Sequence, residues 1–201
     1  MLDGPRLRPR AGGQPRQLVV FLHGYGADGQ DLIEIGRAWQ GLLPRAAFVS
    51  PHAPELCGIA GAGRQWFGLT FRDPGERWRG VNVATPLLER FLDAELGRCQ
   101  LSPSALALVG FSQGTMMALH AGLRRATAPA AIVGYSGMLV LPDRELEGSA
   151  EQIKARPPVL LVHGEADDLI PVQALFEAAE GLAALGIAVE WHLSSGVGVT
   201  A

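Results

Sequence analysis

A serine between two glycines is the residue of this chain best suited to covalent chemistry. Ser112 lies in the G-F-S-Q-G motif of residues 110–114, between the apolar run 106–109 and the helix-like segment 115–121. This pattern predicts a nucleophile elbow, a sharp strand-to-helix turn that exposes a serine hydroxyl. Side chains at the two glycine positions would collide with the neighbouring backbone. The alternative is a glycine-rich turn without chemistry.

Carboxylates that could support this serine occur later in the chain. A serine hydroxyl is a weak nucleophile, so it needs a nearby base, and the base needs a carboxylate to fix its tautomer. Residues 163–168 read H-G-E-A-D-D after an apolar run, and on such a fold the acid follows the serine in chain order. Asp167 or Asp168 is therefore expected beside the elbow. The alternative is a solvated turn or a cap of the next helix.

The remaining elements form the frame that must position these groups. Strand-like apolar runs are expected at 17–23, 46–50, 106–109, 130–136, 159–164 and 187–193, and helices at 31–42, 83–97, 113–121 and 172–185. Alternating strands and helices predict an α/β fold with a mostly parallel, doubly wound sheet and helices on both faces. Residues 1–16 read as an extended lead-in and 137–142 as a loop. The aromatic, glycine-rich segment 55–80 is expected to form an irregular pocket wall, or else a surface loop held by its aromatic side chains.

Composition restricts the class of protein. The 201 residues are 48% hydrophobic and 18% charged, which suits a single domain spanning 1–201. A net charge of −3 does not favour nucleic acid, and the apolar runs are too short to span a membrane. Residues 1–17 have no apolar core and do not resemble a secretory signal. Cys57 and Cys99 are too few for a metal site, and free thiols suggest the cytoplasm.

Four motifs, taken together and in order, resemble the phospholipase/carboxylesterase family, the bacterial carboxylesterases related to acyl-protein thioesterases within the α/β-hydrolase superfamily. They are L-H-G-Y-G-A-D at 22–28, Q-W-F at 65–67, G-F-S-Q-G at 110–114 and H-G-E-A-D at 163–167. The resemblance covers most of the chain. It implies the α/β-hydrolase fold and a serine esterase activity that needs no cofactor and no metal.

The resemblance also implies roles for individual residues. Ser112 would be the nucleophile and Asp167 the triad acid, with Asp168 in reserve. The backbone N–H groups of Tyr25 and Gln113 would form the oxyanion hole. An acyl pocket would be lined by Trp66, Phe67, Leu69, Phe71, Met138, Leu139 and Leu141.

The family pattern breaks near the end of the sequence. The family's histidine is expected in a short glycine-rich loop after the last strand, where this chain has Val199. The family's closing helix is also absent, so one face of the last strand is expected to be uncovered, whether it carries Val189, Trp191 and Leu193 or Ile187 and Ala188. This suggests a truncated or altered terminus. The other histidines, at 23, 52, 120, 163 and 192, are expected to be structural rather than substitute bases.

Two functions follow. The first is a serine hydrolase of short- or medium-chain carboxyl esters, with thioesters and lysophospholipids as further candidates. The second is a catalytically impaired α/β-hydrolase relative that binds an acyl ligand or a partner protein. A peptidase or dienelactone-type hydrolase would share Ser112 and differ only in its pocket. The expected partner is a small-molecule ester, and a homodimer is expected through the uncovered sheet edge or the pocket rim.

Overall fold

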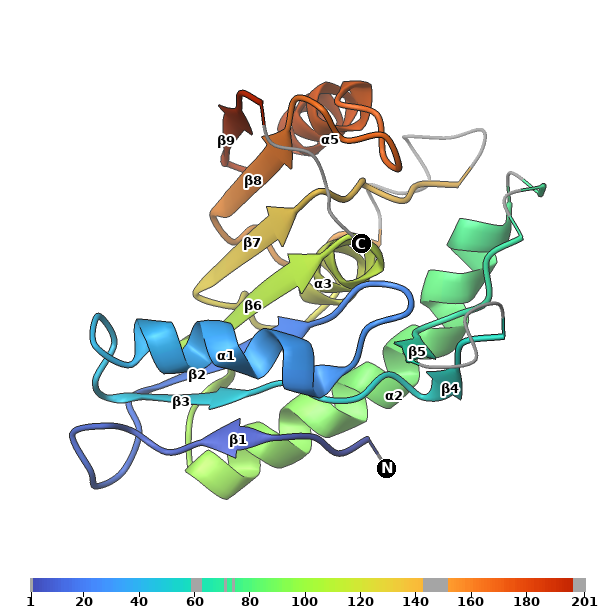
Figure 1. Ribbon diagram of the computed structural model, residues 1–201. Helices are drawn as coiled ribbons and strands as arrows, with labels where there is room; N and C mark the ends of the chain where they lie inside the picture. Colours follow the sequence, from blue (N-terminus) through green and yellow to red (C-terminus); the bar gives the residue numbers. More distant parts are fainter. Residues whose placement is uncertain (1, 59–62, 71, 74, 143–151, 197–201) are drawn as a thin grey trace.

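A seven-stranded sheet forms the centre of the computed structural model (Figure 1), which describes residues 2–58, 63–70, 72–73, 75–142 and 152–196. The strand order is β1-β3-β2-β6-β7-β8-β9. The strands are β1 (Arg6–Leu7), β2 (Gln17–Leu22), β3 (Ala46–Val49), β6 (Leu106–Phe111), β7 (Ala131–Tyr135), β8 (Val159–Gly164) and β9 (Val189–Ser194). All neighbouring pairs are parallel except β1 with β3. The predicted doubly wound α/β architecture is confirmed.

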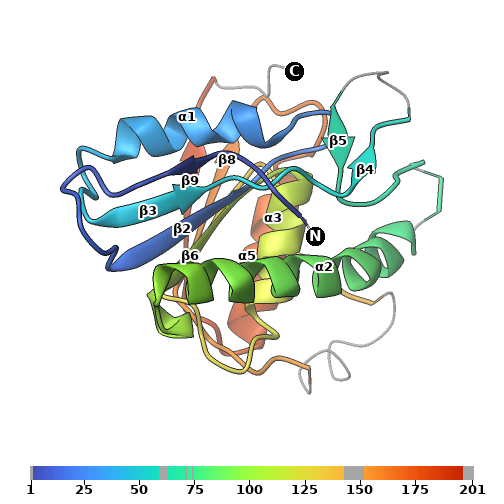
Figure 2. The same ribbon diagram turned by 90° about the horizontal axis from the view of Figure 1, so that it is seen from below.

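Helices cover the two faces of the sheet unequally. Helix α1 (Gly29–Trp39) packs on one face, over β1, β2 and β3. Helices α2 (Glu76–Cys99), α3 (Gln113–Gly122) and α5 (Gln173–Ala184) lie on the other, as Figure 2 shows. None of the described helices covers the α1 side of β7, β8 and β9. In the described part of the chain, no helix is long and apolar enough to cross a membrane.

The first helix begins where its cap dictates. Asp28 accepts the N–H of Gln30, and the Asp31 side chain accepts the N–H of Asp28, so the two residues form a capping box. This places the start of α1 at Gly29, slightly before the expected range. Its buried Ile33 packs with Phe21 and Phe48 in a core on this face, and Leu32, Ile35 and Trp39 are partly buried against that core.

Three expectations for the N-terminal half need correction. The lead-in contains β1, in which Arg6 pairs with Val49 and its side chain forms an ion pair with the buried Glu95. The segment expected to be irregular contains the antiparallel pair β4 (Glu55–Leu56) and β5 (Arg64–Gln65). Helix α2 begins at Glu76 rather than Val83, and it continues through Pro86.

A buried histidine makes the stability of the fold depend on pH. His120 of α3 is 3% exposed and lies 5.4 Å from the Trp78 ring, while the Arg124 guanidinium lies over the same ring. Burial, together with the charge of Arg124, lowers the His120 pKa from its ordinary value of 6.5 to about 3. The imidazole is therefore neutral in the folded protein at pH values where it is charged in the unfolded chain.

Replacing His120 by leucine is expected to reduce the acid sensitivity of folding. Because the folded-state pKa is depressed, the unfolded chain binds the extra proton, and stability falls as the pH drops below 6.5 towards about 3. Between pH 6.5 and pH 4 the free energy of unfolding should fall by about 3 kcal/mol less in the variant than in the parent. Urea unfolding at a series of pH values measures this. An equal fall in the free energy of unfolding below pH 6.5 in the two proteins would contradict this role of His120.

Candidate active site

The serine of the G-F-S-Q-G motif lies at a sharp corner between β6 and α3. Ser112 has φ 53° and ψ −115°, a strained conformation for a residue with a side chain. Its N–H donates to Tyr135 O at 2.9 Å, and its carbonyl accepts the N–H of Thr115 at 2.9 Å. The residue is half-buried, and its hydroxyl has no hydrogen-bond partner among the described residues. The corner therefore holds an available hydroxyl at the carboxyl end of the central strand.

The two motif glycines allow this corner to close. A Cβ at Gly114 would lie 1.8 Å from Leu22 O, and one at Gly110 would lie 2.4 Å from Gly114 O. Backbone atoms block both positions, so no side-chain rearrangement could make room. This is the steric requirement expected for an elbow.

The loop after β2 lies directly against the serine. A Cβ at Gly24 would lie 3.3 Å from Ser112 Cβ and 3.1 Å from Phe111 Cδ1. The loop is fixed from its other side, because Gly26 N–H donates to Arg64 O and Arg64 N–H donates to Ala27 O. Tyr25 lies between Gly24, which approaches Ser112, and Gly26, which is bonded to Arg64.

The side chain of Gln113 connects the elbow to the aromatic segment, a role that the sequence did not reveal. It is fully buried, accepts the N–H of Trp66 at 2.8 Å, and donates to Phe67 O at 2.8 Å. Trp66 in turn donates from its indole Nε1 to His23 O at 3.0 Å. The Q-W-F motif and the L-H-G-Y-G-A-D motif are therefore fixed to each other through buried hydrogen bonds.

The acid loop follows β8, which is separated from β6 by β7 at the same carboxyl edge of the sheet. Asp167 is 7% exposed, and its Oδ1 accepts the N–H groups of Leu169 and Ile170 at 3.0 and 2.9 Å. Its Oδ2 is buried and has no hydrogen-bond partner among the described residues. The neighbouring Asp168 is exposed. Of the two candidates, Asp167 thus has the oriented and buried carboxylate, and its Oδ2 accepts no hydrogen bond from the described residues although His163 Nε2 lies 3.4 Å away.

Two buried histidines are committed to structural contacts. His23 donates from Nδ1 to Gly24 O at 2.8 Å and accepts the Ala53 N–H at Nε2, and burial lowers its pKa. His163 Nε2 donates to Ile170 O at 2.8 Å and lies 3.4 Å from Asp167 Oδ2. Both therefore shape loops that border the site.

The other histidines lie elsewhere, and Val199 is outside the described residues. His52 accepts the Gly29 N–H. His120 is buried against Trp78, and His192 is exposed on β9 at the sheet edge. None of the hydrogen bonds made by the described histidines involves Ser112.

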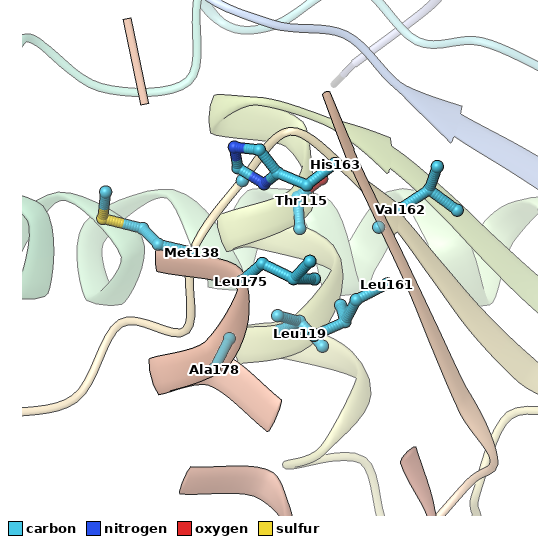
Figure 3. A pocket seen from close by; sticks show the side chains of 10 residues that line it. Thr115, Leu119, Met138, Leu161, Val162, His163, Leu175 and Ala178 are labelled. Carbon is cyan, nitrogen blue, oxygen red and sulfur yellow. The ribbon is translucent and has the colours of Figure 1, made fainter. Parts of the chain in front are cut away.

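The residues expected to line one acyl pocket are divided between two hollows. A groove of about 770 Å³ is bordered by Tyr25, Phe67, Leu69, Val83 and Arg79, among others. Met138 instead lines a narrow crevice between α3, β8 and α5, together with His163 and Leu175 (Figure 3), and this crevice has no room for a water molecule.

The other expected lining residues differ in their placement. Trp66 is 1% exposed and belongs to the main core, and is not among the groove-lining residues. Leu139 is half-buried beside Gly181 of α5 and, like Leu141, borders neither hollow. Phe71 lies outside the described residues.

A second strained residue was not anticipated. Ser136, directly after β7, has φ 43° and is 8% exposed, and its N–H donates to Val162 O at 2.9 Å. It occupies the strand end between those that carry Ser112 and Asp167. Within the described residues, no group of acidic, histidine or cysteine side chains could hold a metal ion, and Cys57 and Cys99 are free thiols.

A strained serine at a glycine-flanked strand–helix corner, on a mostly parallel sheet with a later acid loop, defines the α/β-hydrolase class. The chain belongs to the Phospholipase/Carboxylesterase family, which it matches over residues 10–198. The chain is thus an enzyme of the carboxylesterase and acyl-protein thioesterase kind.

Individual relatives agree with this assignment. The crystal structure of esterase PE8 matches with a TM-score of 0.92 and 41% identity, covering 99% of this chain and 91% of that one. Acyl-protein thioesterase 1 of Gibberella zeae is 27% identical, covering 95% of this chain and 86% of the relative. Esterase YpfH of Escherichia coli is 27% identical, covering 85% of this chain and 70% of the relative.

Proposed function

We propose that this chain hydrolyses carboxylic esters through an acyl-enzyme formed on Ser112. The observation that carries the proposal is the corner conformation of Ser112, φ 53° and ψ −115°, with the Gly24 loop against its side chain. The Ser112 hydroxyl would attack the ester carbonyl carbon, expel the alcohol and leave the acyl group on the serine oxygen. Water would then hydrolyse that acyl-enzyme.

The N–H groups of Tyr25 and Gln113 are proposed as the oxyanion hole. Gly24 contacts Ser112, and Gln113 begins the helix that follows it, which supports this placement. The developing negative charge would lie at the N-terminus of α3, where the helix dipole also favours an anion. Donors of this kind are typically worth about 3–4 kcal/mol each in transition-state stabilisation.

Asp167 is proposed as the acid that orients the base. Its unpartnered Oδ2 supports this, since a buried carboxylate oxygen without a donor is costly unless a donor reaches it. In the family pattern that donor is a histidine, at the position that Val199 occupies in this sequence. Without the base, only the oxyanion hole and substrate binding would contribute, a deficit on the order of 10⁴–10⁶ in rate.

The groove beside Tyr25 is proposed as the substrate site. Phe67, Leu69 and Val83 supply apolar surface, and the groove's volume of about 770 Å³ suits a short or medium acyl chain. Thioesters and lysophospholipids are the further candidate substrates. The cytoplasm is the proposed location, since the two unbridged thiols suit a reducing compartment.

A non-catalytic acyl-binding or protein-binding role is the second candidate. It is favoured by one observation, namely that no described histidine is hydrogen-bonded to Ser112, while His23 and His163 are engaged by backbone groups. In this role the corner and the groove would be retained for binding without turnover.

Reaction with an alkyl fluorophosphonate distinguishes the two functions. We expect slow, stoichiometric labelling of Ser112, detected as a mass shift of the peptide that contains it, and complete loss of labelling in Ser112→Ala. Labelling should be slow because the proposed triad has Val199 at the position of its base. If Ser112 stays unlabelled on prolonged incubation while a fatty acid binds saturably, the esterase proposal is wrong and the binding role is supported.

A further inference from the structure

The last strand leaves one backbone edge of the sheet open. Strand β9 pairs with β8 on one side and is the terminal strand of the sheet in the described part of the chain (Figure 1). Exposed strand edges are ready to pair with another strand unless they are blocked. Glu190, Trp191 and His192 of this strand are all exposed, and Trp191 retains 51% of its surface while its ring packs against Phe176 of α5.

The ladder with β8 shows which residues have free backbone groups. The carbonyls of Ala188 and Ser194 accept N–H groups of Val159 and Glu165, so these two residues face β8. Because backbone direction alternates along a strand, Glu190 and His192 also direct their N–H and C=O groups towards β8. Val189, Trp191 and Leu193 therefore direct theirs outward, to the open edge.

The side chains alternate in the same way. Trp191 is the register partner of Leu161 and lies on the α5 face of the sheet with Val189 and Leu193. Glu190 and His192 lie on the opposite face, which no described helix covers beside β9. The expectation for β9 is corrected in part, because the exposed Ala188 is followed on the uncovered face by these two polar residues, whereas Ile187 is buried.

The sequence of β9 is complementary to itself when read in reverse. We propose that β9 pairs antiparallel with β9 of a second copy of this chain, across a twofold axis at Trp191. In this register Val189 faces Leu193 of the second copy, and Glu190 faces its His192. The outward-directed residues then form the hydrogen-bonded pairs, in which each residue exchanges N–H···O bonds with its partner.

Charge complementarity favours this register and a second copy of the chain as the partner. Glu190 and His192 become a non-hydrogen-bonded cross-strand pair, the type in which side chains approach most closely. An imidazole N–H can donate to a carboxylate whether or not the ring is protonated. The twofold axis repeats the pair, and it brings the exposed Trp191 rings of both copies together. A twofold axis at Glu190 or His192 would also pair outward-directed residues, but it would place Glu190 opposite Glu190 or His192 opposite His192, and like charges directly opposite each other are unfavourable.

Charge exchange across the axis tests this arrangement. By sedimentation equilibrium at pH 7 we expect a species of twice the 21.3 kDa chain mass. Glu190→Lys or His192→Glu alone should raise the dimer dissociation constant about tenfold, because each places like or unfavourable charges in both pairs. The double variant should restore the parent value within about threefold. Glu34→Lys, an exposed change on α1, is the matched control and should have no effect.

A proline variant tests the backbone pairing separately from the charges. Val189→Pro removes an outward N–H that β8 does not use, so the fold should persist by circular dichroism while the dimer is lost. A monomer at all concentrations would overturn the proposal. A dimer unchanged by the single charge variants would also overturn it and would place the interface elsewhere, for example at the groove rim. Neither outcome depends on whether Ser112 is reactive.

Discussion

Val199→His is expected to raise the hydrolysis of p-nitrophenyl butyrate about 10³-fold. The variant places an imidazole where the family pattern has its base, and loss of a triad histidine costs on the order of 10⁴–10⁶ in rate. The buried Oδ2 of Asp167 is available to orient the new ring. Initial rates at saturating ester, compared with the parent chain, measure the gain.

The gain should depend on both proposed partners of the new histidine. In the Val199→His background, Asp167→Asn should remove most of the gain because an amide cannot stabilise the imidazolium, whereas the exposed Asp168→Asn should leave it nearly unchanged. Ser112→Ala should remove it completely. If the parent chain already hydrolyses esters at ordinary esterase rates, the account of the missing base is wrong and His192 must be reconsidered.

Gly114→Ala is expected to destabilise the protein by more than about 3 kcal/mol. The new Cβ would lie 1.8 Å from Leu22 O and 2.4 Å from Leu22 C, and both atoms belong to the β2 backbone. Relief would require moving α3 away from the sheet, which would also displace Ser112. Thermal unfolding should show a decrease in Tm of about 10 °C or a failure to fold.

Gly97→Ala provides the matched control for this change. Gly97 is also within a helix, α2, but a Cβ there meets nothing within 4 Å. Alanine should therefore be neutral or stabilise by about 0.5–1 kcal/mol through helix propensity. Equal effects of the two substitutions would contradict the claim that close backbone approach requires Gly114.

The strand–helix pattern and the elbow could be predicted because their signals are local. Residues 106–114 contain an apolar run followed directly by G-F-S-Q-G, and the structure has a strand, a strained serine and the start of a helix there. The family resemblance already favours Asp167 over Asp168, and the structure adds a physical difference between them, because only Asp167 is buried and accepts the N–H groups of Leu169 and Ile170.

Features that depend on distant contacts could not be predicted in this way. Strand β1 has two residues and is defined by pairing with β3, and Arg6 is held by Glu95, far away in sequence. The role of Gln113 depends on Trp66 and Phe67, which lie in a segment without regular periodicity. The early start of α2 was missed because glycines and polar residues obscure its first turns.

The separation of the expected acyl pocket into two hollows has the same origin. The aromatic residues of 65–71 and the apolar residues of 138–141 look equivalent in sequence, since both follow strands and both are apolar. Their places are decided by packing, with Phe67 on the groove and Met138 on the crevice beside α5. Trp66 enters the core because its indole N–H reaches the His23 carbonyl.

A crystal structure of the chain after reaction with a small alkyl fluorophosphonate tests the central claim most directly. The account predicts a phosphonyl group on Ser112 Oγ, with its phosphoryl oxygen about 2.7–3.1 Å from the N–H groups of both Tyr25 and Gln113. An adduct whose phosphoryl oxygen points away from either amide, or an unmodified Ser112, would contradict it.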